Sequence, residues 1–331
     1  MIRRRLMRAA AIGEVAAERV FFRGNLDMLR IEPYGGYATP DHLVVRGRVL
    51  AAREVETIDG KSRLANARQM FRLLATHEVA DVTVTSGACS AVTDAEGYFT
   101  LLLPRGDQVG WIDVAVSIPG QTVLCPVLVA RPDARWIVVS DIDDTVIHTG
   151  AWSTLRNLWT SFTGNVASRK VFDDSVALIR GLADNGRNPV YFVSSSPWNF
   201  HGFLDEVFRK AGLPDAPKFL RDYGFGEDQF ITGRHGDHKG GAIDRIAAAH
   251  PDLPLVLIGD TGQQDAEIYA DAAVRHPGRV ARVILRVAGG RGDTAVRLQA
   301  ERLHSLGIPV SMDTDFRAAL ADIATAEPAG V

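Results

Sequence analysis

The chain has 331 residues, of which 46% are hydrophobic and 23% are charged, and its formal net charge is −3. This length exceeds that of an average domain and predicts two domains, each with a core of its own. A slightly negative globular chain has no overall attraction to nucleic acid or anionic lipid, so we expect no nucleic-acid partner.

The cysteines and the N-terminus favour a reducing, cytoplasmic location. Cys89 and Cys125 show no paired metal-ligand spacing, which argues against a disulfide scaffold or a zinc site. Arg8 and Glu14 interrupt the apolar stretch that a signal peptide would need. The basic residues at 3–8 predict either a solvated terminus or a weak amphipathic helix on a membrane surface.

Residues 1–133, which include this basic segment, are predicted to form an all-β, sandwich-like accessory domain. Short alternating runs such as "LVVRGRVL", "GYFTLLLP" and "WIDVAVSI" lie between residues 43 and 130 and are separated by turn signals. Such alternation is typical of antiparallel strands with one buried face. One helix is expected around residues 65–76.

Residues 134–331 are predicted to form an α/β domain with a mostly parallel sheet covered by helices on both faces. The polar stretch "ARPDAR" marks the boundary, and strand and helix patterns alternate after it. The expected strands are 136–140, 189–193, 255–258, 280–286 and 308–312, and the expected helices are 173–185, 199–211, 239–249, 264–275, 293–306 and 315–325.

Polar side chains follow the first three of these strands. Asp141 and Asp143 follow the first strand and Asp260 follows the third. The second strand delivers Ser194, Ser195 and Ser196. Each is a weak signal alone, because loops commonly begin with polar residues. Their fixed order is more specific, because the carboxyl ends of parallel strands meet at one edge of a sheet.

These residue types suit phosphoryl transfer. Mg²⁺ takes carboxylate oxygens together with phosphate and water, and Asp141 and Asp260 can supply the carboxylates. Asp141 is the candidate nucleophile that forms an aspartyl-phosphate, and Asp143, two positions on, is the candidate acid and base. Lys239, at a helix start, and Ser194 would stabilise the transferred phosphoryl group.

The motifs also resemble a known group of enzymes. "DIDDT" after an apolar strand, a strand-end serine, a downstream lysine and "GDTGQQD" resemble the motifs of the haloacid dehalogenase superfamily of phosphatases, which have a Rossmann-like domain. More narrowly, "SDIDDTVIHTG", "YFVSSSPWNF", "FLRDYG" and "LIGDTGQQDAEIY" resemble the magnesium-dependent, lipin-related phosphatidate phosphatases of the actin-patch-protein type. The resemblance covers roughly residues 134–315.

This resemblance implies hydrolysis of phosphatidic acid to diacylglycerol and phosphate. It implies Asp141 as nucleophile, Asp143 as acid and base, and Ser194 and Lys239 on the phosphate. It also implies Mg²⁺ on Asp141, on the carbonyl of Asp143 and on Asp260.

Three further residues are candidates only through the resemblance. Asp265 is expected beside the metal or its ligands, and Arg221 and Asn199 are expected near the substrate. Ser195 would replace Ser194 on the phosphate if the second strand ended one residue later.

Alternatives remain open for the substrate and for membrane contact. A soluble phosphomonoester is the alternative substrate, and a catalytically silent phosphatidate-binding module is the alternative function. The aromatic and apolar residues of 151–166 predict either a peripheral membrane contact or a small cap helix packed on its own domain.

Overall fold

The computed structural model describes residues 29–51, 79–148, 171–221, 235–262, 264–287 and 294–325. The basic N-terminal segment, the helix expected at 65–76 and the segment 151–166 lie outside these described residues.

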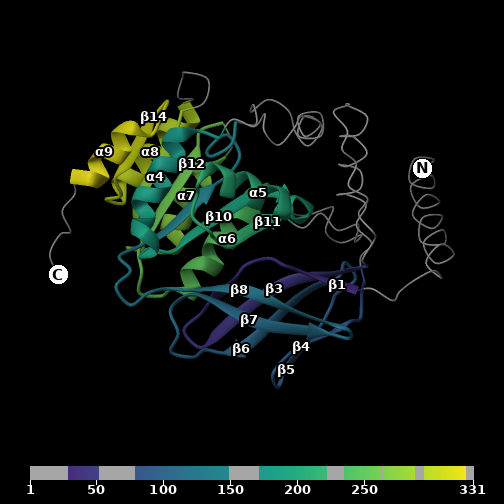
Figure 1. Cartoon of the computed structure of the whole chain (residues 1–331). Helices are drawn as coiled ribbons and strands as arrows, with labels where there is room; N and C mark the ends of the chain where they lie inside the picture. The colour runs from purple at the N-terminus through teal and green to yellow at the C-terminus, as the bar shows by residue number, and fades with distance from the viewer. Residues whose placement is uncertain are drawn as a thin grey trace, which may run out of the picture.

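The N-terminal region is built from strands, as predicted, but two stacked sheets are not confirmed. Its described strands form a single eight-stranded sheet in the order β1-β3-β2-β8-β7-β4-β5, with β6 paired to β3. The sheet curls around a core of its own that includes Val45, Phe99 and Val116 (Figure 1). The strands are β1 (Leu29–Pro33), β2 (Gly36–Ala38), β3 (His42–Ala51), β4 (Thr83–Ser86), β5 (Cys89–Val92), β6 (Tyr98–Pro104), β7 (Gly110–Ile118) and β8 (Gln121–Val129).

A tight hairpin joins β7 to β8. Ile118 pairs with Gln121, so only Pro119 and Gly120 make the connection. Gly120 has a φ of 83°, a conformation that glycine adopts without the steric cost of a side chain. The Pro-Gly pair therefore fixes the register of the longest strand pairing in this sheet.

The second sheet is entirely parallel, as predicted. Its six strands have the order β11-β10-β9-β12-β13-β14, so β9 lies at the centre between β10 and β12. The strands are β9 (Ile137–Asp141), β10 (Val190–Pro197), β11 (Lys218–Arg221), β12 (Leu255–Asp260), β13 (Val280–Arg286) and β14 (Val310–Asp313).

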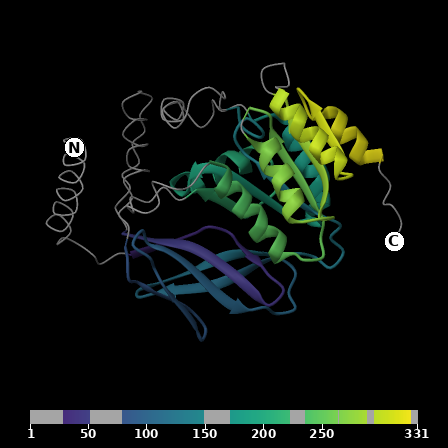
Figure 2. The ribbon, with the colours of Figure 1, turned by 180° about the vertical axis from the view of Figure 1, so that it is seen from behind.

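Helices cover both faces of this sheet (Figures 1 and 2). On β9, Ile137 and Val139 join the core beneath α6, α7 and α8, whereas Val138 joins the core beneath α4, α5 and α9. This split follows from the alternation of side chains along a strand. The helices are α4 (Asp173–Ala183), α5 (His201–Ala211), α6 (His235–Ala249), α7 (Asp265–Arg275), α8 (Thr294–Ser305) and α9 (Arg317–Thr325).

The N-terminal sheet packs directly on the α/β part of the chain. Tyr37, Val44 and Leu128 belong to the same apolar core as Tyr191 and Phe219. In Figure 1 the N-terminal sheet accordingly lies against α6 and the β10 and β11 edge of the parallel sheet. The domain boundary at residues 133 and 134 stays a prediction.

Two elements near the site differ from the expected ones. β10 continues to Pro197, four residues beyond the predicted end at 193, and therefore includes all three serines. β11 was not predicted, because it has only four residues and follows directly on Pro217, too little sequence for a strand signal.

Among the helices in the described part of the chain, none has the length and apolar character needed to cross a bilayer.

The parallel sheet provides a direct test of the packing. Leu257 of β12 is fully buried, whereas Leu298 of α8 is 59% exposed. We expect Leu257→Ala to lower the free energy of unfolding by about 2–5 kcal/mol, because it leaves a cavity in the core. Leu298→Ala, the matched control, should cost less than about 0.5 kcal/mol. Urea unfolding measures both, and equal effects would contradict the packing described.

Candidate active site

The carboxyl ends of the three central strands bring the predicted site residues together. Val193 of β10 lies opposite Asp141 of β9, and Ile258 of β12 lies opposite Ser140. Asp141, Ser194 and Asp260 therefore emerge from neighbouring strands at one edge of the sheet. This is where ligand sites form in open parallel sheets.

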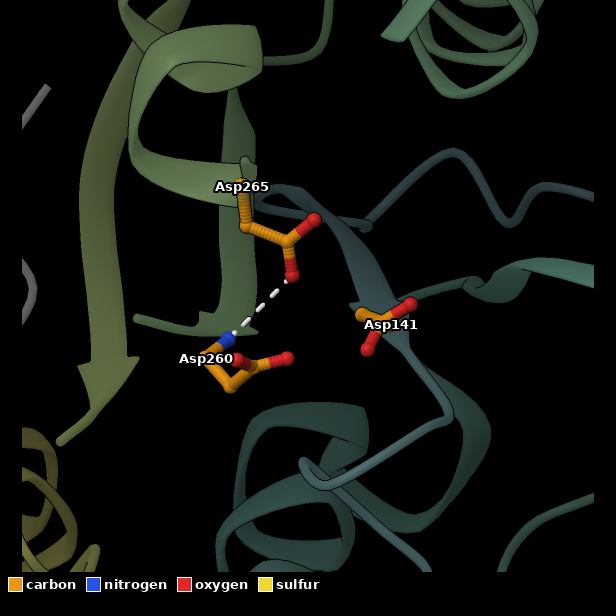
Figure 3. A group of neighbouring side chains, drawn as sticks. All are labelled: Asp141, Asp260 and Asp265. Atoms are coloured by element: carbon orange, nitrogen blue, oxygen red, sulfur yellow. Dashed lines mark hydrogen bonds between the residues drawn. The ribbon is translucent and has the colours of Figure 1, made fainter. Parts of the chain in front are cut away.

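Three carboxylates converge at this edge (Figure 3). Asp141 ends β9, Asp260 ends β12 and Asp265 opens α7. One oxygen from each lies within 4.8 Å of the others, and all three side chains are buried. Like charges this close and this far from water repel strongly, so the cluster needs a counter-charge.

Lys239 of α6 supplies part of that counter-charge. Its Nζ lies 2.6 Å from Asp141 Oδ1 and 2.6 Å from Asp265 Oδ1. Burial alone would lower the pKa of Lys239, but the two carboxylates outweigh burial and raise the pKa above its ordinary value. Lys239 is therefore a permanent ammonium at the centre of the cluster.

A backbone hydrogen bond and close packing against Gly259 hold Asp265 in place. Its Oδ2 accepts a hydrogen bond of 3.2 Å from the Asp260 N–H. Tyr269, one helical turn later, donates to the Ile258 carbonyl oxygen at 2.8 Å. A Cβ on Gly259 would lie 2.5 Å from Asp265 Oδ2 and 2.8 Å from the Tyr269 hydroxyl. Only glycine allows α7 to approach the end of β12 this closely.

Asp143 lies beside two serine hydroxyls. Ser194 Oγ donates to Asp143 Oδ2 at 2.7 Å, and Ser196 Oγ donates to the same oxygen at 3.3 Å. The Ser196 N–H in turn donates to Ser194 Oγ at 2.9 Å. Desolvation raises the pKa of Asp143, and the hydroxyls and Lys239 offset only part of the rise. A raised pKa favours the protonated form that a general acid needs.

The Asp141 carboxylate is fixed from a second side. Thr145 Oγ1 donates to Asp141 Oδ2 at 3.2 Å, and the Thr145 carbonyl accepts a 2.6 Å bond from Ser175 Oγ of α4. Burial raises the pKa of Asp141 well above its ordinary value; Lys239 opposes this, while the neighbouring carboxylates add to it. Lys239 therefore offsets only part of the effect of burial on this carboxylate.

The donor set fits a hard divalent cation. Oxygen ligands from two or three carboxylates at one edge are typical of Mg²⁺ or Ca²⁺ sites and unlike the Cys and His sets that hold zinc. Asp141 and Asp260 are the predicted protein ligands, and the structure places Asp265 close enough to join them or to orient them.

The remaining predicted residues lie on β10, just after it, and on the neighbouring strand β11. Ser194 and Ser196 face Asp143, so Ser195, between them on β10, is directed to the opposite side of the strand. Asn199 follows in the short helix η3 (Trp198–Phe200). Arg221 ends β11 opposite Pro197.

Thr145 and Tyr269 were missed at the sequence level, and Ser196 was noted at the strand end but given no role in the site. Ser196 carries a period-two signal, because it lies two positions after Ser194 on a strand. Tyr269 lies four positions after Asp265 on a helix and therefore shares its face. Thr145 carries no such signal, since its role depends on where the turn after β9 directs its hydroxyl.

Comparison with known proteins shows what this region is similar to. Residues 136–287 match the sequence model described as Phosphatidate phosphatase APP1, catalytic domain. The resemblance to phosphatidate phosphatases of the actin-patch-protein type is thus confirmed over this part of the chain. Every carboxylate described above, together with Lys239, lies inside the matched region.

Two yeast proteins are each similar to this chain over 45% of its length. Phosphatidate phosphatase APP1 of Saccharomyces cerevisiae is 27% identical over 149 residues, 45% of this chain and 25% of that protein. An uncharacterized protein of Schizosaccharomyces pombe is 28% identical over 150 residues, 45% of this chain and 24% of that protein. The chain thus aligns with only about a quarter of each of these relatives.

Among solved structures, a Thermotoga maritima protein assigned as a β-phosphoglucomutase aligns with a TM-score of 0.35 and 12% identity. The alignment covers 56% of this chain and 99% of that one. This score is below the level at which two chains are taken to share a fold.

The close approach at Gly259 is open to test. We expect Gly259→Ala to displace Asp265 and to weaken divalent-cation binding by about 10–100-fold, because partners that orient metal ligands contribute that much. The matched control is Gly106→Ala, where an added Cβ would meet nothing within 4 Å. Calorimetric titration with Mg²⁺ measures both variants. Unchanged affinity in Gly259→Ala would show that Asp265 does not support the cation site.

The raised pKa values of Asp141 and Asp143 predict how stabilisation by a cation depends on pH. A carboxyl whose pKa rises on folding binds more protons in the folded state than in the unfolded state. The cation-free protein therefore loses stability as the pH rises from the pKa of that carboxyl in the unfolded chain to its higher pKa in the folded protein. Cations bind the ionised carboxylates, so the rise in melting temperature with millimolar Mg²⁺ should be larger near pH 7.5 than near pH 5.

Differential scanning fluorimetry with and without chelator measures this difference. Asp260→Asn should abolish it, because one candidate ligand is lost. Asp271→Asn, on the partly exposed side of α7, should leave it intact. An equal shift at both pH values would mean that cation binding does not involve these carboxyls.

Proposed function

We propose that this chain, whose residues 136–287 match the APP1 catalytic domain, is a Mg²⁺-dependent phosphatase that hydrolyses phosphatidic acid to diacylglycerol and phosphate. The observation that carries the proposal is the buried cluster of Asp141, Asp260 and Asp265 around Lys239, at the end of a parallel sheet and inside the matched region.

Asp141, Asp260 and the backbone carbonyl of Asp143 would hold the Mg²⁺ ion. When bound, the ion neutralises charge on the phosphate and on the carboxylates, so that one anion can approach another. The raised pKa of Asp141 supports this role, because the cluster lacks positive charge without a cation.

The first step forms an aspartyl-phosphate on Asp141. A carboxylate oxygen of Asp141 bonds to phosphorus, and the bond from phosphorus to the diacylglycerol oxygen breaks with its electron pair. Asp143 donates a proton to that leaving oxygen, which departs as the alcohol. The raised pKa of Asp143 suits it to hold this proton.

The second step returns Asp141 to its starting state. Asp143, now ionised, accepts a proton from a water molecule, whose oxygen bonds to phosphorus. The bond between phosphorus and the Asp141 oxygen breaks, and inorganic phosphate leaves. One carboxyl thus serves as acid and then as base, and it ends the cycle protonated again.

Lys239 and the serine pair act on the phosphoryl group. The Lys239 ammonium, 2.6 Å from Asp141 Oδ1, is close enough to the nucleophile to pair with a phosphate oxygen during transfer. Ser194 and Ser196 can donate hydroxyl hydrogens to the remaining oxygens when substrate displaces them from Asp143. Fixed donors of this kind stabilise charge that develops in the transition state.

A lipid substrate implies peripheral contact with a membrane surface at a cytoplasmic face. The apolar segment 151–166 is the predicted contact, and it lies outside the described residues. A soluble phosphomonoester is the alternative substrate within the same chemistry. A silent binding module would not need Asp141 and Asp143, which this chain carries together.

Phosphate release from phosphatidic acid in detergent micelles tests the activity. We expect release with Mg²⁺, none with chelator, and a fall in kcat of at least about 10³-fold in Asp141→Asn, because the nucleophile is lost. Asp271→Asn serves as the matched control and should retain wild-type activity, since it loses only a partly exposed ion pair with Arg302. Equal release from wild type and Asp141→Asn would refute the mechanism.

A panel of soluble phosphomonoesters, such as sugar phosphates, separates the two substrate classes. We expect kcat/KM for micellar phosphatidic acid to exceed that for each soluble ester. A clear preference for a soluble ester would replace the lipid substrate while leaving the chemistry in place.

A further inference from the structure

The N-terminal sheet reaches the segment that follows the active-site serines. Asn199 lies three residues after Ser196, in the short helix η3 at the end of β10. Its side chain contacts the N-terminal sheet, more than a hundred residues earlier in the chain.

Arg48 of β3 makes this contact from a buried position. Its Nη1 donates to Asn199 Oδ1 at 3.3 Å, and its Nε donates to the Glu96 carbonyl at 2.7 Å. The guanidinium lies 4.4 Å from the centre of the Tyr98 ring. Arg48 is only 1% exposed, so it is held rigidly and cannot itself reach a substrate.

Aromatic contacts hold the residue before Asn199. Tyr34 stacks on Trp198 with ring centres 4.6 Å apart and planes 17° from parallel. Arg46 lies 5.4 Å from the same Trp198 ring. It also joins the two sheets, because its Nη2 donates to the Gly35 carbonyl at 2.9 Å and to the Lys218 carbonyl at 3.1 Å.

These contacts lie a short and regular stretch of chain from the site. β10 carries Ser194 and Ser196 and ends at Pro197, immediately before Trp198. The only irregularity in its pairing with β11 falls between Val193 and Pro197, so β11 alone does not fix the serines by a regular ladder. The contacts to Trp198 and Asn199 therefore supply the second anchor for this stretch.

We propose that Arg48 is a positioning residue: through Asn199 it holds the end of β10, and thereby the two serine hydroxyls, in the geometry that binds phosphate. The N-terminal sheet is then a structural part of the active site and more than a targeting module. This inference rests on the proposed phosphatase function.

Steady-state kinetics of the full chain test the proposal, with micellar phosphatidic acid and with p-nitrophenyl phosphate as substrates. We expect Arg48→Ala to lower kcat by about 10–100-fold on both, because small displacements of positioning groups have effects of this size. Arg48→Lys keeps the positive charge but lacks the planar guanidinium with its several N–H donors, so it should recover only part of the lost kcat. Arg105→Ala, an exposed arginine of the same region that bonds the Thr39 carbonyl, is the control.

A double-mutant cycle tests whether Arg48 acts through Asn199. If it does, Arg48→Ala combined with Asn199→Ala should be no slower than the slower single variant. Fully additive losses would overturn the proposal and indicate that Asn199 acts on substrate by itself. Asn199→Ala with Arg48→Lys completes the cycle if Arg48→Ala does not fold.

Two further measurements, the affinity for inorganic phosphate and the KM for micelles, distinguish a positioning role of Arg48 from other roles. Inorganic phosphate with Mg²⁺, titrated by calorimetry, should bind Arg48→Ala about tenfold more weakly than wild type, and this reading holds even if phosphatidate is not the substrate. If the variants only raise the KM for micellar phosphatidic acid, the N-terminal sheet would instead bind the lipid surface, and the proposal would be overturned. Arg48→Ala and Asn199→Ala variants that match Arg105→Ala in both kcat and phosphate affinity would overturn it as well.

Discussion

The buried pairing of Lys239 with Asp141 and Asp265 is the interaction on which the site depends. It ties α6, β9 and α7 together at one point. An ammonium and two carboxylates this far from water are tolerated only because each is paired, and removing one partner leaves an uncompensated charge. The excess of negative charge in this cluster favours a cation beside the carboxylates.

The surrounding structure keeps this arrangement rigid. Thr145 holds Asp141 through a hydrogen bond, and the Asp260 N–H holds Asp265 in the same way. Asp265 lies so close to Gly259 that residue 259 has no room for a side chain. A phosphoryl-transfer site gains mainly from such positioning and charge compensation, because the protein contributes little covalent chemistry beyond the nucleophile. The parallel sheet therefore serves as a frame that brings polar strand ends together.

The sequence predicted the parallel sheet, its order of elements and the strand-end positions of Asp141 and Asp260. These follow from long apolar runs that end abruptly in acidic residues, a signal that needs no tertiary information. The reach of β10 and the existence of β11 could not be predicted in the same way. Ser194 to Pro197 have no apolar pattern, and the strand is extended to Pro197, which pairs with Arg221 of β11. The single curled N-terminal sheet likewise depends on which strands pair, and alternation alone does not specify partners.

The core shared by the two sheets bears on how this protein can be divided. Tyr37 lies 5.5 Å from Phe219 and 6.3 Å from Tyr191, ring centre to ring centre, and Leu128 closes the same core. A recombinant fragment that begins at residue 134 would lack the residues that cover Tyr191 and Phe219. The apolar surface exposed in this way would promote self-association. The region that carries the chemistry thus shares its apolar core with residues that precede it in the chain.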